Sequence, residues 1–255
     1  MIRESLYFTY DGKPSYEFGI LNVAIGNGLY EESLVANRSI IEERVRGRKK
    51  PHFFGINEDP LEIPVSFAFT DKYDEQKIRQ VVRWLFQSYY KPLVFSSNPN
   101  RIFYCTPVDD STLVHNGLRQ GYITLKFRCD SPYSYSSFIT SSVFNIASEQ
   151  IIEVDCNTDE DIYPNIYFKK LSAGEFSITN LSDSGREFKF KDLLSNETIH
   201  VDCENEEIET DVSNRYIWNN FNNQFLKLVY GKNRLLVKGD CENLYFKFQN
   251  ILRQG

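Results

Sequence analysis

The chain has 255 residues, of which 41% are hydrophobic and 25% are charged, and its net charge is −6. This length suits two domains of roughly 100 to 150 residues, and the 20 Phe and 16 Tyr residues supply enough apolar surface to exclude wholesale disorder. The negative charge excludes general affinity for nucleic-acid phosphates, which requires clustered Lys and Arg side chains.

The first predicted elements are two strands joined by a turn within residues 5–25. Apolar residues alternate with polar ones before the turn Asp11-Gly12 and resume their spacing after it. The apolar positions are Leu6, Phe8 and Tyr10, followed by Phe18, Ile20 and Val23. This pattern is typical of a β-hairpin.

Residues 26–60 differ from the predicted strands on either side of them. They combine a charged run with two aromatic residues that look exposed. The basic run 44–50 is interpreted as a solvated loop tip in preference to a nucleic-acid patch. Phe53 and Phe54 follow it and precede Gly55. Such a segment is what an arm that reaches a neighbouring subunit looks like, although a surface loop without a partner fits equally well.

A strand over residues 61–69 leads to the clearest helix of the sequence, predicted over about 71–91. Thr70 or Asp71 is expected to cap its N-terminus, and Pro92 ends it. One face is predicted to be buried because apolar residues recur at intervals of three and four. They are Ile78, Val81, Val82, Leu85, Phe86 and Tyr89.

The rest of the chain is predicted to be β-structure. A half-buried strand over residues 121–128 precedes a Pro and Ser-rich segment, which places the domain boundary between residues 135 and 136. After it, eight short apolar runs separated by Gly, Asn, Asp and Ser predict an antiparallel sandwich. The runs are 151–154, 166–168, 176–178, 188–190, 198–201, 225–229, 235–237 and 244–248.

The sequence contains no recognisable catalytic motif. His52, His115 and His200 lie far apart, and the acidic runs 155–161 and 202–211 lack the alternation of a calcium loop. We therefore predict no catalytic residues, no bound metal and no cofactor. A glycan hydrolase that uses acids such as Asp155 and Asp202 is the least favoured alternative.

A sugar-binding platform is a second alternative. Trp218 precedes an Asn-rich segment that includes Asn220, and an aromatic ring beside amide groups can stack on a sugar and hydrogen-bond to it. A core Trp at a strand end, followed by an Asn-rich turn, explains the same pattern and is favoured. If the platform exists, Trp218→Ala should abolish cell-wall binding.

The cysteines and the hydropathy indicate the compartment. The five cysteines are widely spaced and contain no Cys-x-x-Cys pair, which argues against a disulfide framework and a zinc site. No stretch approaches the roughly 18 apolar residues of a membrane span, and residues 1–8 lack an apolar signal core. We expect synthesis in a reducing cytoplasm without membrane insertion.

Taken together, these features resemble the distal tail (Dit) proteins of siphophages. The N-terminal half resembles that family at residues 8–12, 18–20 and 127–133. The C-terminal half follows the family's sandwich pattern in order, at residues 176–181, 197–202, 226–228, 230–235 and 239.

The resemblance implies a structural protein with a mainly β fold. The N-terminal domain would be a β-sheet or split-barrel domain with one helix and an extended belt arm, and the C-terminal domain a galectin-like or carbohydrate-module-like sandwich. Six N-terminal domains would form a ring at the distal tip of the virion tail. The ring would contact the tail tube protein, the tail-tip hub and receptor-binding proteins, and DNA would pass through it without specific binding.

The belt would clasp the neighbouring subunit through residues 45–55. The expected interface residues are Arg46, Arg48, Lys49, Phe53 and Phe54. Some members of the family carry long inserted sugar-binding modules, for which this chain has no room. A carbohydrate-binding accessory protein for host adsorption is the alternative to the hub.

Overall fold

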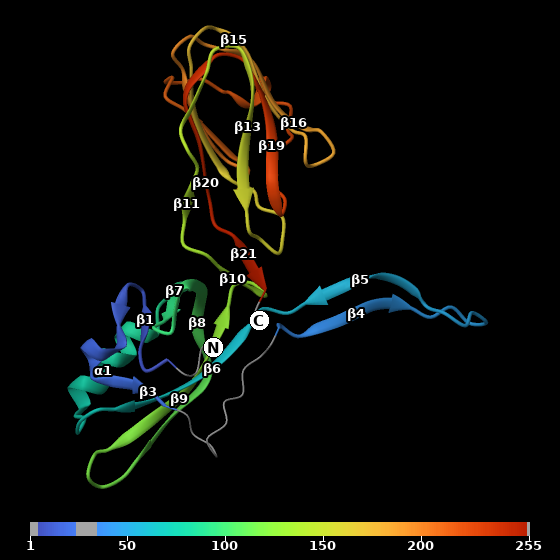
Figure 1. Ribbon diagram of the computed structural model, residues 1–255. Helices are drawn as coiled ribbons and strands as arrows, with labels where there is room; N and C mark the ends of the chain where they lie inside the picture. Colours follow the sequence, from blue (N-terminus) through green and yellow to red (C-terminus); the bar gives the residue numbers. More distant parts are fainter. Residues whose placement is uncertain (1–4, 24–34, 254–255) are drawn as a thin grey trace. The chain divides into compact units, whose positions relative to one another are not determined.

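The computed structural model describes residues 5–23 and 35–253, so the start of the predicted arm at residues 26–34 lies outside the described residues. The chain forms two compact units (Figure 1). Unit 1 comprises Met1–Tyr135 with Arg253–Gly255, and unit 2 comprises Ser136–Leu252. Within the described residues, no helix has the length and apolar character that a membrane span requires.

Unit 1 is built on an antiparallel sheet with the strand order β2-β1-β7-β8-β9-β6-β3, and β10 (Tyr133–Tyr135) pairs with β8. The path along the sheet does not follow the sequence, because β3 lies at one edge and β1 near the other. The strands are β1 (Phe8–Tyr10), β2 (Lys13–Pro14), β3 (Ile20–Asn22), β6 (Glu62–Phe69), β7 (Lys91–Phe95), β8 (Asn98–His115) and β9 (Gly121–Cys129).

The predicted N-terminal hairpin is correct at its turn and wrong in its second strand. β1 and β2 pair around Asp11-Gly12, but β2 has only two residues. Ser15 is buried, accepts a hydrogen bond from the Phe8 amide at 3.2 Å and is the first residue of the short 3-10 helix η1 (Ser15–Phe18). Gly19 at φ 61° ends it, and β3 then pairs with β6 instead of β1.

The helix α1 (Glu75–Leu85) is shorter than the predicted span of 71–91. Asp74 is the N-cap, in place of Thr70 or Asp71, and its carboxylate accepts a hydrogen bond from the Lys77 amide at 2.7 Å. Asp74 satisfies one of the free amides of the first turn, which fixes the start of the helix there. The helix ends at Leu85, about two turns before Pro92, so this proline does not terminate it.

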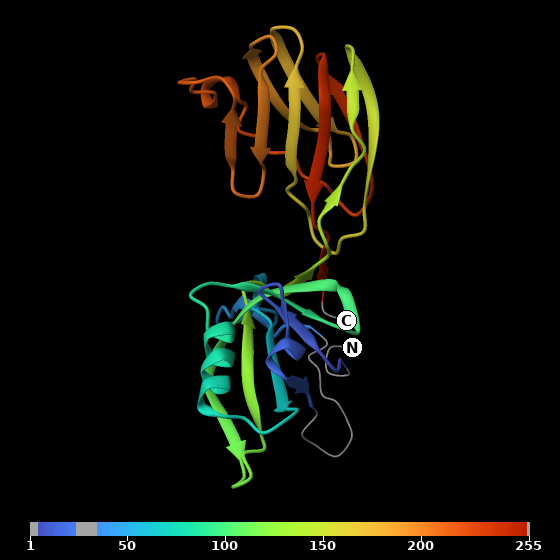
Figure 2. The same cartoon turned by 90° about the vertical axis from the view of Figure 1, so that its left-hand side faces the viewer.

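Trp84, which the predicted stripe omitted, holds α1 to the sheet. Its ring stacks on Phe18 with centroids 4.1 Å apart, and its indole nitrogen donates to the Tyr10 carbonyl at 2.8 Å. Val81 and Leu85 are buried beside it. The buried face of α1 is therefore centred on Trp84, and Figure 2 shows the helix lying along the sheet of unit 1.

Three residues of the predicted stripe are not buried. Val82 is 45% exposed, Phe86 is 44% exposed and Tyr89 is 73% exposed. For Tyr89 the helical spacing of three and four residues no longer applies, because the helix ends at Leu85. The prediction of a single apolar face is thus wrong, and α1 carries a second, exposed apolar row.

Unit 2 is an antiparallel sandwich of two sheets, which confirms the predicted mainly β fold class. One sheet has the order β11-β20-β14-β17-β18 with β12 beside β20, and the other has the order β13-β19-β15-β16. The first contains β11 (Ile139–Thr140), β12 (Phe144–Ile146), β14 (Asn165–Lys170), β17 (Thr198–Asp202), β18 (Glu207–Thr210) and β20 (Cys241–Phe248). The second contains β13 (Glu149–Cys156), β15 (Gly174–Asn180), β16 (Arg186–Leu193) and β19 (Gly231–Lys238).

The core of unit 2 is rich in Phe side chains. Phe168 of β14 stacks on Phe176 of β15 with ring centroids 4.0 Å apart, which joins the two sheets. Of the eight predicted strands, the run 225–229 is wrong, because only Leu228 bridges another segment, at Ile162. Phe225, Leu226 and Leu228 are nevertheless buried, so the apolar run indicated burial and not a strand.

Candidate functional site

The arm is a two-stranded antiparallel sheet that is separate from the sheet of unit 1. Its strands are β4 (Arg38–Glu43) and β5 (His52–Glu58), and we use the term arm for residues 38–58. Ile40 lies opposite Ile56, and the register shifts between Ile41 and Glu42. Figure 1 shows the two strands projecting from unit 1 as one extended hairpin.

The apolar side chains of the arm are exposed. Every residue of β4 is exposed, including Ile40 at 64%. Phe53 and Phe54 are exposed at 63% and 66%. A two-stranded hairpin is marginal in water by itself, and exposed apolar clusters mark contact sites. The arm therefore has the character of a segment that binds another surface.

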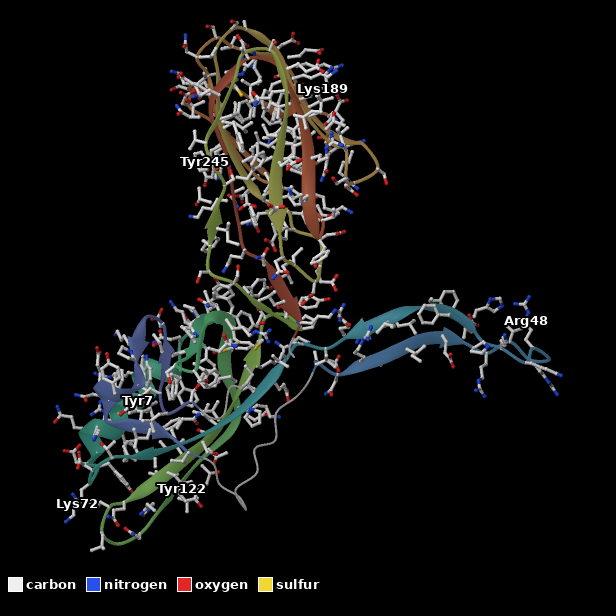
Figure 3. The ribbon with its side chains drawn as sticks, viewed as in Figure 1. Tyr7, Arg48, Lys72, Tyr122, Lys189 and Tyr245 are labelled. Carbon is white, nitrogen blue, oxygen red and sulfur yellow. The ribbon has the colours of Figure 1, made fainter. Side chains whose placement is uncertain are left out.

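The tip of the arm carries the predicted basic residues. Arg46, Arg48 and Lys49 are all exposed, and Gly47 takes the positive φ of 90° that the turn requires. Arg48 contacts the His52 ring, and Figure 3 shows its side chain at the outer end of the arm. That these residues form an interface stays a prediction.

Glu58 anchors the base of the arm. Its carboxylate receives hydrogen bonds from Tyr133 and Arg253, both at 2.8 Å, and lies 2.9 Å from the Arg38 guanidinium. Arg253 belongs to β21 (Ile251–Arg253). The hydrogen bonds from Arg253 and Tyr133 hold the pKa of Glu58 below its usual range. Glu58 therefore stays ionised and fixes the point where the arm leaves unit 1.

Sequence reasoning missed this cluster. Glu58 and Arg253 are separated by 195 residues in the chain, and each member of the cluster is an ordinary charged or polar residue. The only usable signal is the position of Glu58 itself, because a carboxylate at the end of a projecting strand needs charged partners there.

Trp218 and Asn220 lie on the short 3-10 helix η2 (Trp218–Asn220) of unit 2. The Trp218 ring is half-buried and packs edge-on against Phe221 and Phe225, with centroids 6.4 and 6.2 Å away. The side chain of Asn222 holds the backbone of β16 and is not free for a ligand. These contacts match a core Trp, and a sugar platform at Trp218 and Asn220 stays a prediction.

The histidines and acids highlighted in the sequence are not brought together. His52 is on the arm, His115 ends β8 and His200 lies in β17. The His200 ring bonds Asn165 at 2.8 Å and stacks on Tyr167, so it is held within the face of its sheet. Among the described residues, no group of three or more His, Cys, Asp or Glu side chains could hold a metal ion.

Asp202 has a structural contact of its own. Its carboxylate accepts hydrogen bonds from the amides of Glu204 and Asn205 at 3.0 Å, which closes the turn after β17. Burial opposes ionisation of this carboxyl, but the hydrogen bonds outweigh it and lower the pKa of Asp202. A carboxylate held ionised in a turn serves the loop and is poorly suited to act as a general acid.

Models of known protein families match both halves of the chain. Residues 3–131 match a phage tail protein N-terminal domain, and residues 133–248 match a phage tail C-terminal domain. The chain is also 36% identical over 242 residues to the SPbeta prophage-derived uncharacterized protein YomH of Bacillus subtilis (strain 168). That alignment covers 94% of this chain and 96% of the relative.

Two solved phage proteins share the fold. The Dit (gp 19.1) protein of phage SPP1, described as a hub of the adsorption apparatus, superposes with a TM-score of 0.71 at 17% identity. This match covers 96% of this chain and 98% of the other. A chain of the phage P2 baseplate in its activated conformation matches with a TM-score of 0.56 at 11% identity, over 96% and 97% of the two chains.

Proposed function

This chain belongs to the family of phage tail proteins, and from that premise we propose that it forms the distal hub of the tail, a ring of its own copies held together by the arm. It is a structural protein of the tail and not an enzyme. The single observation that carries the proposal is the arm itself, an exposed hairpin whose Ile and Phe side chains are uncovered in the isolated chain.

The physical argument starts from what these side chains gain by contact. Burying an exposed Phe or Ile side chain contributes about 1.5–3 kcal/mol, so Ile40, Phe53 and Phe54 together favour association. An arm on one copy that meets a different surface on the next makes a head-to-tail contact, which gives a ring when the rotation between copies closes on itself. The six-fold symmetry of this ring follows from the resemblance to Dit proteins.

The remaining partners are assigned by the same proposal. The ring would join the tail tube protein to the tail-tip hub, and the sandwich of unit 2 would dock receptor-binding proteins. A chain with a net charge of −6 suits a channel through which DNA moves without sticking. The protein would be made in the bacterial host before it is built into the virion.

Removal of the arm tests the proposal. Residues 39–57 are replaced by Asn-Gly, which closes a tight hairpin turn and keeps the Arg38–Glu58 ion pair. The native chain should form rings of roughly six copies, measured by light scattering and negative-stain imaging with tail tube protein present or absent. The shortened chain should stay a folded monomer.

Two results would count against the proposal in different ways. If the shortened chain still forms the same rings, the arm does not hold the ring together. If the native chain remains a monomer both alone and with tail tube protein, the hub itself is wrong. Circular dichroism of both chains provides the control that each is folded.

A further inference from the structure

The helix α1 exposes a row of apolar side chains that the sheet of unit 1 does not cover. Val82 and Phe86 lie four residues apart, and Tyr89 follows them after the helix ends. All three are exposed, at 45%, 44% and 73%. Residues four apart share one helical face, so Val82 and Phe86 form a continuous surface. We call Val82, Phe86 and Tyr89 the outer row.

Charged side chains extend the outer row toward the start of α1. Arg83 lies between Val82 and Phe86, Arg79 comes before Val82, and Glu75 and Asp74 lie at the N-terminus of the helix. All four are exposed. Among residues 5–23 and 35–253, neither arginine forms an ion pair. From its C-terminal to its N-terminal end, this surface is therefore apolar at Tyr89 and Phe86, mixed apolar and basic from Arg83 to Arg79, and acidic at Glu75 and Asp74.

The arm has the complementary order. Near its base it exposes Ile40 and Ile56, followed by Phe53 opposite Glu42. Glu42 and Glu43 come next along β4, and the basic run 44–50 forms the tip. From base to tip, the arm is therefore apolar, then acidic, then basic. Opposite charges that face each other across an interface fix its register and exclude wrong partners.

We propose that the outer row of α1 receives the arm of an adjacent copy, with the tip of the arm directed toward the N-terminus of the helix. This proposal rests on the ring proposed above and names its acceptor surface. Ile40, Ile56 and Phe53 would cover the outer row, and Glu42, which shares their face of the hairpin, would face Arg79 and Arg83 with Glu43 beside it on the opposite face. The basic tip would face Asp74 and Glu75.

The contact must form between two copies. The arm ends just before β6 begins at Glu62, and α1 begins after β6 ends at Phe69. A strand of this length spans about 25 Å, and Figure 1 shows the arm and α1 at opposite ends of unit 1. Within one chain both surfaces are exposed, so they do not cover each other.

A hollow beside the base of the arm is a poorer acceptor. It is lined in part by Val35, Leu61, Lys126 and Arg128. Lys126 is already paired with Glu62 and Asp109, each at 2.9 Å. Arg128 donates to the Tyr90 hydroxyl at 2.9 Å. The cations of this hollow therefore have partners, whereas Arg79 and Arg83 have no ionic partner among the described residues.

Charge reversal tests the register. One variant carries Arg79→Glu with Arg83→Glu, a second carries Glu42→Arg with Glu43→Arg, and a third combines all four changes. Each two-site variant should raise the concentration needed for half-assembly by at least about tenfold, and the combined variant should recover most of this loss. Reversal of two exposed charges on β16, Glu187→Arg with Lys191→Glu, is the matched control and should leave assembly unchanged.

A cysteine cross-link provides a second readout. All five native thiols are buried, so the pair Phe53→Cys with Phe86→Cys should dominate oxidation by diamide. It should give a ladder of covalent multimers, whereas Phe53→Cys with Leu118→Cys, which places the second thiol on another exposed site, should not. Leu118 is 64% exposed in the turn between β8 and β9.

The outcomes distinguish the proposal that α1 is the acceptor from the proposal that the copies form a ring. If native rings form while both two-site reversals assemble like the native chain and the Phe53–Phe86 pair gives no ladder, the acceptor is not α1 and the ring stands. If the two-site reversals weaken assembly but the combined variant does not recover, the proposed register is wrong. If the native chain never assembles, both proposals fall together.

Discussion

The arm and the sandwich core contain the same kinds of side chain in the same kind of strand, yet their exposure is opposite. Phe188 and Phe190 of β16 are fully buried, whereas Phe53 and Phe54 of β5 are 63% and 66% exposed. The difference lies in what faces each strand, because β16 has a second sheet opposite it and the arm has none. Aromatic residues in a strand thus serve folding or association according to the surface that meets them.

The largest effect on stability is expected from a substitution in the core of the sandwich. Phe168→Ala removes a buried ring that stacks on Phe176, and the change should lower the free energy of unfolding of unit 2 by about 3–5 kcal/mol. Urea unfolding followed by tryptophan fluorescence measures it, because Trp84 lies in unit 1 and Trp218 in unit 2. A Trp84→Phe background isolates the signal of unit 2.

The size of this loss also tests the role of the Phe168 side chain. A loss of unfolding free energy below about 1 kcal/mol would contradict the view that the aromatic ring of Phe168 joins the two sheets of unit 2. The Phe168→Ala chain should still assemble into rings of subunits at urea concentrations where unit 2 remains folded, since the arm belongs to unit 1.

A smaller effect is expected at the base of the arm. Glu58→Gln removes the negative charge that Arg253, Tyr133 and Arg38 share, and we expect about 1–2 kcal/mol less protection of the arm against local opening. Hydrogen exchange of the amides in β4 and β5 measures this protection. Exchange in β16 provides the internal control and should not change.

The pH dependence of this protection has a defined sign. The pKa of Glu58 is lower in the folded chain than in the unfolded chain, where it is about 4.3. The stabilisation is therefore fully present above that value and is lost as the pH falls through the lowered pKa. In the Gln variant this contribution to the pH dependence should disappear, and its persistence would assign the effect to another group.

The smallest effect on stability is expected from substitutions of the exposed Phe residues of the arm. Phe53→Ser with Phe54→Ser should change the free energy of unfolding by less than about 0.5 kcal/mol, because neither ring is packed in the isolated chain. Assembly should nevertheless be lost. The matched control is Tyr216→Ser with Tyr230→Ser, which alters aromatic residues of unit 2 that are 68% and 73% exposed. Equal assembly of the two double variants would contradict a special role for the arm.

The sequence was a good guide where a pattern is local. Alternation along the strands of unit 2 predicted seven of its eight assigned runs, because a sheet with one buried face imposes a period of two. The helix was predicted, with Val81 and Leu85 correctly on its buried face, but its cap was wrong and Trp84 was missed, since contacts with Phe18 and Tyr10 from elsewhere in the chain bury that ring.

Long-range contacts were out of reach. Nothing near Glu58 indicates that Arg253 will bind it, and nothing near Ile20 indicates that β3 pairs with β6 instead of β1. The exposed pair Phe53-Phe54 could be identified because it stands beside charged residues and Gly55. The acceptor surface that we propose on α1 could not be identified, because the same apolar periodicity that marks a buried face also produced the outer row.

The bond between Glu58 and Arg253 also orders events during synthesis. Arg253 is made 195 residues after Glu58, which takes about 10–40 s at bacterial rates of translation. Until then the ribosome holds a nascent chain whose arm lacks one of the partners of Glu58. Each copy therefore carries an arm without this bond to Glu58 until residue 253 has been made.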